Sequence, residues 1–216
     1  LAPPFYDTAT KSWPLKSNFF TAGVLHSGGR DFVLYIMIGI LLVFILSLLI
    51  KRLKSCRKGA GYLLVGSLLG PAVVSVLKHT THIYTPWDLE LFGGDKPYIR
   101  LFDHVPAGLP VGNAFPGGHS SGGFALLSFY FLLSVYKPKY RYYGLALGLL
   151  VGTTFAAAQE VRGAHFLSHD LLSLVICWYS ALFVYYVFFQ MFPNQQLPVM
   201  PEEPVTVENS TTTSVA

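Results

Sequence analysis

The stretch FVLYIMIGILLVFILSLLIKRLKSCRK, residues 32–58, decides the class of this protein. Its first part, Phe32–Ile50, contains no charged residue and is long enough to cross a bilayer, which takes about 20 mostly apolar residues in a helix. Its second part is a short connection that carries five basic residues: Lys51, Arg52, Lys54, Arg57 and Lys58. Short loops rich in Lys and Arg stay on the cytoplasmic side of a membrane. The stretch therefore predicts a transmembrane helix that runs inward and ends at the cytoplasm.

The rest of the chain repeats this pattern, with four more uncharged runs that are long enough, or nearly so, to span a bilayer: Gly59–Leu77, Ser120–Tyr136, Tyr142–Gln159 and Leu171–Phe192. Only 12% of the residues are charged, whereas a soluble domain carries about 25%. We predict an all-α fold, a polytopic transmembrane helical bundle with five spans. Because the first span starts outside, we expect a sixth span upstream of Leu1; a processed or translocated amino terminus is the alternative.

The predicted spans divide the chain into three regions. Residues 1–31 form a polar and aromatic lead-in at the outer membrane surface. Residues 32–192 form the transmembrane domain, which includes an outer segment, residues 79–116, too polar to cross. Residues 193–216 are rich in Pro, Thr and Glu and are expected to form a disordered cytoplasmic tail.

The charged residues indicate the orientation. A second basic loop with no acid contains Lys137, Lys139 and Arg141, so both basic loops are expected in the cytoplasm. The outer segment then faces the periplasm if the source is bacterial, and the protein lies in the inner membrane with a cytoplasmic carboxyl terminus. The net charge of +4 comes from these loops and does not indicate a nucleic-acid partner. Cys56 and Cys177 are not placed for a disulfide.

The sequence FPGGHSSGG, residues 115–123, contains the first group of candidate site residues. Pro116 followed by small residues and an apolar run predicts a helix start, whose free amides bind anions such as phosphate. Gly117 and Gly118 would let a ligand approach that backbone, and His119 stands beside it. The alternative is that Gly118 and Gly122 form a small-residue pair for close helix contact.

The sequence VRGAHFLSHD, residues 161–170, contains the second group. In a helix, Arg162, His165 and His169 would share one face, with Asp170 close by. A cation, an imidazole and a carboxylate are what phosphoryl transfer through histidine requires. The alternative is an interfacial cluster in which Arg162 extends toward lipid headgroups. Lys78, at the end of a span, is on its own an anchor as readily as a ligand.

Taken together, the three segments resemble the type 2 phosphatidic acid phosphatase superfamily, which is related to the vanadium haloperoxidases. That family has the motifs K-x6-R-P, P-S-G-H and S-R-x5-H-x3-D. Here Lys78 is followed by Thr85-Pro86, then by PGGH at Pro116–His119 and by GAHFLSHD at Gly163–Asp170. The resemblance covers roughly residues 59–192.

The resemblance implies a role for each matching residue. His165 looks like the nucleophile that forms a phosphohistidine, and His119 like the general acid that protonates the leaving oxygen. Lys78 looks like a phosphate-binding cation, and the amides of Gly117 and Gly118 extend the phosphate site. The family is similar in using no metal or other cofactor and in binding vanadate as a transition-state mimic.

Four positions depart from the family pattern. Thr85 and Gln159 replace two arginines, Gly117 replaces a serine and His169 replaces the aspartate. Arg162, one helical turn after Gln159, is expected to take over one phosphate contact with Gln159 assisting. Arg100 or Lys96 of the outer segment is expected to supply the rest. Either His169 or Asp170 orients His165, and we favour Asp170.

These observations predict an integral-membrane phosphatase. Its partner is a phosphorylated lipid in the bilayer, and the resemblance admits undecaprenyl pyrophosphate, phosphatidylglycerol phosphate, phosphatidic acid or a lipid A phosphate. The aromatic residues Tyr84, Trp87, Phe92 and Phe102 either line the path of an acyl or isoprenyl chain or simply lie at the interface.

Three other functions would use parts of the same pattern. A lipid-to-lipid phosphotransferase would use the same site. A zinc-dependent hydrolase would use His165 and His169 at helical spacing with His119 or Asp170, although H-E-x-x-H is absent. A transporter or proton relay built on the boundary histidines is disfavoured because the predicted spans carry no charge.

Overall fold

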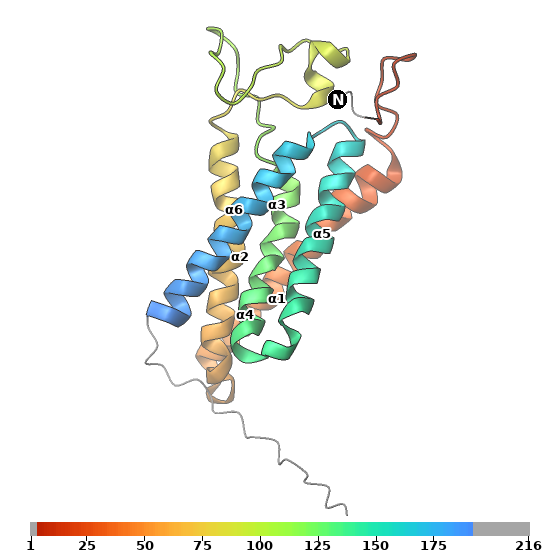
Figure 1. Ribbon diagram of the computed structural model, residues 1–216. Helices are drawn as coiled ribbons and strands as arrows, with labels where there is room; N and C mark the ends of the chain where they lie inside the picture. The colour runs from red at the N-terminus through yellow and green to blue at the C-terminus, as the bar shows by residue number, and fades with distance from the viewer. Residues whose placement is uncertain (1–3, 192–216) are drawn as a thin grey trace, which may run out of the picture.

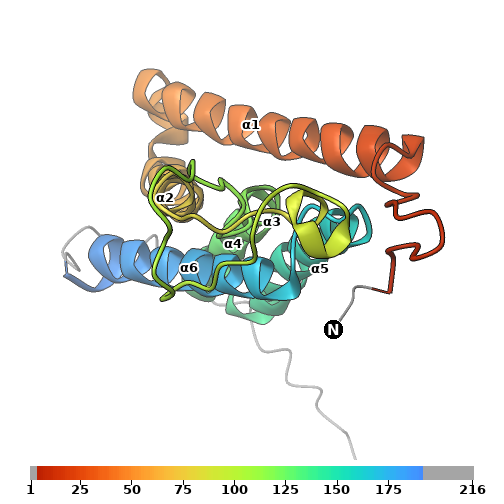
Figure 2. The same cartoon turned by 90° about the horizontal axis from the view of Figure 1, so that it is seen from above.

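The computed structural model describes residues 4–191, and in this range the chain is a bundle of α-helices without a β-strand (Figures 1 and 2). The helices, in chain order, are α1 (Gly29–Leu49), α2 (Arg57–Lys78), α3 (Gly118–Phe124), α4 (Ser128–Tyr136), α5 (Arg141–Val161) and α6 (Leu167–Tyr185). The predicted all-α transmembrane bundle is confirmed. The predicted tail, residues 193–216, lies outside the described residues.

Between residues 4 and 191, four helical stretches are long and apolar enough to cross a membrane. They are Phe19–Leu49, Lys51–Lys78, Pro138–Val161 and Leu167–Met191, with mean hydropathies of 3.0, 1.9, 1.3 and 2.0. The other predicted span, Ser120–Tyr136, lies in a shorter run made of α3, a 3₁₀ turn at Ala125–Leu127 and α4. That run begins with the small and polar residues GHSSGG, which lower its hydropathy. Length and composition thus support four of the five predicted spans.

The first helix begins earlier than the sequence predicts. A π-helical segment, η1 (Phe19–Gly28), continues directly into α1, so the helix starts at Phe19 and not at Phe32. Asn18 caps it, since its side chain accepts a hydrogen bond of 2.8 Å from the Phe20 amide. α1 lies along one side of the bundle (Figure 2), and its apolar side chains are mostly exposed, as expected for a helix that faces lipid.

The α3–α4 run lies at the centre of the bundle, against a stripe of glycines on α5. Gly144, Gly148 and Gly152 are spaced one turn apart on this stripe. A Cβ atom at any of them would collide with the α3–α4 run, at Phe129, Leu127 and Phe124 respectively. Small residues at this contact let the two backbones approach closely. This approach holds the start of α3 beside the end of α5.

The two ends of the bundle differ in chemistry (Figure 1). The basic turns at residues 51–56 and 137–140 lie at one end, which we call the basic end. The outer segment and the junction between α5 and α6, residues 162–166, lie at the opposite end, which we call the site end. The predicted separation of the basic loops from the histidine motifs is therefore seen as two ends of one bundle.

The outer segment folds over the site end around a small core of its own: Trp13, Tyr84, Leu89, Phe92 and Ile99. The aromatic side chains predicted either to line a lipid path or to lie at the interface therefore separate. Tyr84 and Phe92 are buried in this core, whereas Phe102 is 96% exposed. Of these three, only Phe102 is free to meet a bilayer or a lipid chain.

Candidate active site

The junction between α5 and α6 places His165 outside any helix. α5 ends at Val161, and Gly163 has a φ of +77°, a left-handed conformation that favours glycine. The ring of Trp13 occupies the place where a Cβ of Gly163 would be. The prediction that Arg162, His165 and His169 share one helix face is therefore wrong, because Gly163 ends the helix between them. α6 starts anew at Leu167.

Asp170, in the first turn of α6, holds His165. Its Oδ1 lies 2.8 Å from His165 Nδ1, and both side chains are buried. Ser120 of α3 donates a second hydrogen bond of 2.6 Å to the same oxygen. With Nδ1 bonded to the carboxylate, the Nε2 atom of His165 is left to meet a substrate. Ser120 is a residue that sequence reasoning missed, although it lies within the quoted FPGGHSSGG.

His169 does not hold His165. Its ring centroid is 5.7 Å from that of His165, and the rings of Phe115 and Phe166 lie edge-on to it at 5.3 and 5.5 Å. His169 Nδ1 is buried without a hydrogen-bond partner in the described part of the chain. Of the two candidates for orienting His165, the structure brings Asp170 into contact and keeps His169 in an aromatic enclosure.

Gly117 explains how Asp170 reaches His165 from one position later than in the family motif. A Cβ on Gly117 would collide with Asp170 Oδ1 and lie 3.0 Å from His165 Nδ1. The absent side chain at position 117 is thus the space that Asp170 uses, so two departures from the family pattern compensate each other. The predicted role of the Gly117 amide changes, because this amide donates to the His169 carbonyl at 3.0 Å.

Lys78 ends α2 beside the start of α3. Its Nζ lies 3.3 Å from the position that a Cβ of Gly118 would take. Lys78 is half-buried and forms no ion pair with any acidic residue in the range 4–191. It lines a cavity of about 420 Å³ together with Gly118 and Ser121. The alternative pairing of Gly118 with Gly122 is not seen, since nothing lies within 4 Å of a Cβ at Gly122.

Arg162 and Gln159, which lie one helical turn apart, are hydrogen-bonded to each other, a contact that sequence reasoning did not predict. Arg162 Nη1 donates to Gln159 Oε1 at 2.9 Å, and Arg162 Nε donates to the Lys16 carbonyl at 2.9 Å. Gln159 is buried, and burial also lowers the pKa of the Arg162 guanidinium from its ordinary value. A guanidinium nevertheless stays charged in proteins. Arg162 is therefore a fixed cation with nitrogen donors left over for an anion.

His119 is held by the first helix and by α5. Its ring stacks on Phe155 with centroids 4.5 Å apart, and its Nε2 donates to the Leu25 carbonyl at 3.3 Å. The ring of His26 lies against it, with centroids 4.4 Å apart. Sequence reasoning did not select His26; the one available signal was its place in the lead-in, residues 1–31, which is predicted on the outer side.

Three residues of the outer segment were expected at or near the missing arginine contacts, and the structure places them differently. Thr85 is not brought to the site, because its hydroxyl donates to Asp88 Oδ2 at 2.5 Å within the turn that Pro86 begins. Lys96 pairs with its neighbour Asp95 at 2.9 Å. Arg100, in contrast, lines the same cavity as His165.

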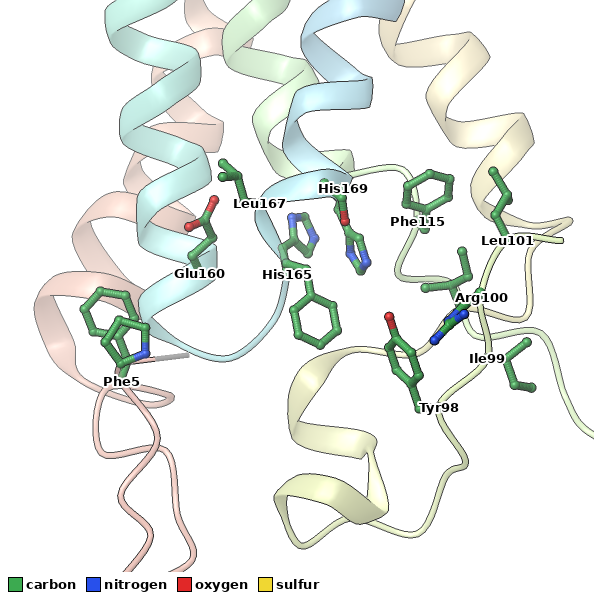
Figure 3. Close-up of a pocket in the computed structure, with 14 residues that line it drawn as sticks. Phe5, Tyr98, Ile99, Arg100, Leu101, Phe115, Glu160, His165, Leu167 and His169 are labelled. Carbon is green, nitrogen blue, oxygen red and sulfur yellow. The ribbon is translucent and has the colours of Figure 1, made fainter. Parts of the chain in front are cut away.

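The cavity beside His165 has a volume of about 560 Å³. Figure 3 shows Tyr98 and Arg100 on one side of it and His165 and His169 on the other. Between these polar groups the wall is mostly apolar, formed by Ile83, Ile99, Leu101, Phe115, Phe166 and Leu167. The arrangement offers a cation and a carboxylate-held imidazole next to an apolar surface.

A metal centre finds no support in the described part of the chain. No group of three or more His, Cys, Asp or Glu side chains within residues 4–191 is arranged to hold a metal ion.

Comparison with known proteins gives one match. A family model described as PAP2 superfamily matches residues 59–193, which is more than half of the chain. The matched range contains the cation at Lys78, the PGGH motif and the His165–Asp170 pair, and it leaves η1 and α1 outside. Searches of curated proteins and of solved structures found no match.

Proposed function

This chain belongs to the PAP2 superfamily, and on that premise we propose that it removes phosphate from a membrane lipid through a phosphohistidine. Members of the superfamily are phosphatases, and the apolar helices make this chain a membrane protein. The single observation that carries the finer proposal is the bond of 2.8 Å between His165 Nδ1 and Asp170 Oδ1 at the wall of the 560 Å³ cavity.

In the proposed reaction, His165 Nε2 attacks the phosphorus atom while the bond from phosphorus to the leaving oxygen breaks. Asp170 stabilises the positive charge that develops on the imidazole. His119 gives its proton to the leaving oxygen, so the lipid departs as an alcohol or as a phosphate shorter by one group. Water then attacks the phosphohistidine and gives a proton back to His119, the bond between nitrogen and phosphorus breaks, and inorganic phosphate leaves.

Three cations at the site end support a doubly charged substrate. Lys78 is a half-buried amine without an ion pair among the described residues, and Arg162 is a guanidinium fixed by Gln159 and Lys16. Arg100 enters from the outer segment. Preorganised positive charge stabilises the oxygens of a transferring phosphoryl group without reorganisation during the reaction.

The apolar wall of the cavity supports a lipid as the substrate. Phosphatidic acid, phosphatidylglycerol phosphate, undecaprenyl pyrophosphate and a lipid A phosphate each present an anionic head next to apolar atoms. The site end lies opposite the basic end, and basic loops are retained in the cytoplasm. We therefore propose that the site faces the periplasm of a bacterial inner membrane and acts without a metal.

The test is phosphate release by the purified full chain from a panel of these lipids. We expect release that persists in EDTA, is blocked by orthovanadate and is abolished in His165→Ala. Release that stops in EDTA and returns with a metal ion would overturn the phosphohistidine proposal. Consumption of the donor lipid without phosphate release would instead identify transfer to a lipid acceptor, and mass spectrometry of the lipid products would reveal that acceptor.

A further inference from the structure

The first helix contributes a residue to the site, although η1 lies outside the range that the family model matches. We infer that His26 of η1 is a positioning residue, which fixes the guanidinium of Arg162 through Gln159 and supports the ring of His119. The inference rests on the proposed function, since it assigns Arg162 and His119 to phosphate binding and proton transfer.

The hydrogen bonds that connect these residues have only one consistent direction. Arg162 can only donate, so the Gln159 atom 2.9 Å from its Nη1 must be the amide oxygen. The other end of that amide is then the NH₂ group, which donates to His26 Nδ1 at 2.8 Å. His26 therefore accepts at Nδ1 and carries its proton on Nε2. An acceptor at this position fixes the amide, and the amide fixes the guanidinium.

The contact with His119 involves the same turn of η1. The Leu25 carbonyl accepts from His119 Nε2 at 3.3 Å, and the next residue, His26, lies against the His119 ring. Phe155 covers the other face of that ring. The helix comes this close to α5 because Gly29 has no side chain, and a Cβ there would lie 2.5 Å from the Phe155 ring.

The lead-in holds the same guanidinium from a second direction. Arg162 Nε donates to the Lys16 carbonyl, a residue that comes before η1 in the chain. Because Gln159 donates to its Nδ1, His26 is a neutral acceptor one residue removed from the Arg162 cation. A neutral acceptor fixes Gln159, and through it the guanidinium, while leaving the positive charge of Arg162 intact. A carboxylate at this position would neutralise that charge.

Two substitutions of His26 distinguish a packing role from a role as hydrogen-bond acceptor. His26→Phe keeps a ring against His119 but has no acceptor for Gln159. His26→Asn loses the ring but offers its amide oxygen near the place of Nδ1. An exposed histidine of the outer segment, changed in His104→Phe, is the matched control.

The experiment measures KM, kcat and the inhibition constant of orthovanadate for the full-length variants with the lipid that the wild type hydrolyses. We expect His26→Phe to raise KM and the vanadate constant by about 5- to 20-fold, the effect of one lost hydrogen bond in a polar site. His26→Asn should recover most of this loss, and His104→Phe should match the wild type. In Arg162→Ala, the further change His26→Phe should raise neither constant, because the residue it positions is gone.

Equal losses in His26→Phe and His26→Asn would overturn the inference, as would a full additional loss in the Arg162→Ala background. Stabilisation of the purified protein by orthovanadate against heat gives a readout that needs no turnover. If the wild type hydrolyses no lipid, the proposed function fails while this readout still decides the role of His26. Stabilisation of the wild type and His26→Asn but not of His26→Phe supports the inference, and the same response in all three overturns it.

Discussion

Two histidines at the site end are held in different ways. His165 is bonded through Nδ1 to the buried carboxylate of Asp170, which Ser120 also contacts. His119 has no carboxylate partner among the described residues, and it is held by the Leu25 carbonyl and by the rings of His26 and Phe155. The contacts of His165 lie within the range matched by the family model. Two of the contacts of His119, those to Leu25 and His26, come from η1, which lies outside that range.

The difference matches the two chemical roles proposed for the histidines. A carboxylate at Nδ1 stabilises the positive charge that forms when His165 attacks through Nε2. Neutral contacts hold His119 in place without the same stabilisation of its charged form, so that it can release a proton to the leaving group. Under the proposed mechanism, the partner of each imidazole, and not the imidazole itself, separates the nucleophile from the acid.

The largest effect is expected from Asp170→Asn, which removes the carboxylate bonded to His165. The amide keeps the shape but removes the charge and changes the ring tautomer that is favoured, so kcat should fall by about 10⁴-fold. Steady-state turnover, with thermal unfolding as a check on folding, measures this. A loss no larger than that of Ser120→Ala would show that the carboxylate only fills space.

His119→Ala removes the second histidine and with it the proposed general acid. Removing a positioned acid should slow the formation of the phosphoenzyme by about 10²–10⁴-fold while leaving its hydrolysis measurable. Rapid quenching with a radiolabelled lipid phosphate resolves the two steps. A substrate whose leaving group needs no proton should be much less affected, and an equal loss on such a substrate would argue against the acid role.

Gly117→Ser restores the residue of the family motif and yet should damage this protein. Its Cβ would collide with Asp170 Oδ1, so we expect a loss of stability of about 1–3 kcal/mol and a clear fall in kcat/KM. Gly122→Ser is the matched control, because its Cβ meets open space. Thermal unfolding and turnover are measured together. Activity at or above that of the wild type would show that Asp170 does not need this space.

Arg162→Lys tests whether the cation at this position is specific. A lysine keeps the charge, but its single nitrogen cannot reach the separate positions from which the guanidinium nitrogens bond Gln159, Lys16 and a phosphate. Its loss of kcat/KM should therefore approach that of Arg162→Ala, about 10-fold or more. Kinetics of both variants against the same lipid decide this. Near-normal activity of the lysine variant would reduce the role of Arg162 to that of a point charge.

Thr85→Ala should have the smallest effect. Its hydroxyl bonds Asp88 within the outer segment, so we expect KM to change by less than about 2-fold and stability to fall by about 0.5–1.5 kcal/mol. Titration with lipid and thermal unfolding measure the two quantities. A large rise in KM would return Thr85 to the phosphate site, where the motif alone places it.

How well the sequence predicts each contact of this site depends on how far apart its two residues lie in the chain. The His165–Asp170 bond joins residues five positions apart, and both were chosen from one quoted stretch. Arg162 and Gln159 were likewise selected together because they lie one helical turn apart, although the bond between them was not predicted. The Gln159–His26 bond joins residues 133 positions apart, and no local pattern indicates it.

The sequence by itself determined that this is a helical membrane protein and predicted a phosphate site on one side of it, because long uncharged runs and short motifs are local properties. Only the tertiary structure decided that Gly117 makes space for Asp170 and that His26 contacts Gln159 and His119. Each of these depends on which surfaces meet when helices distant in the chain pack together, as the glycine stripe of α5 shows. Local spacing carries no information about such meetings.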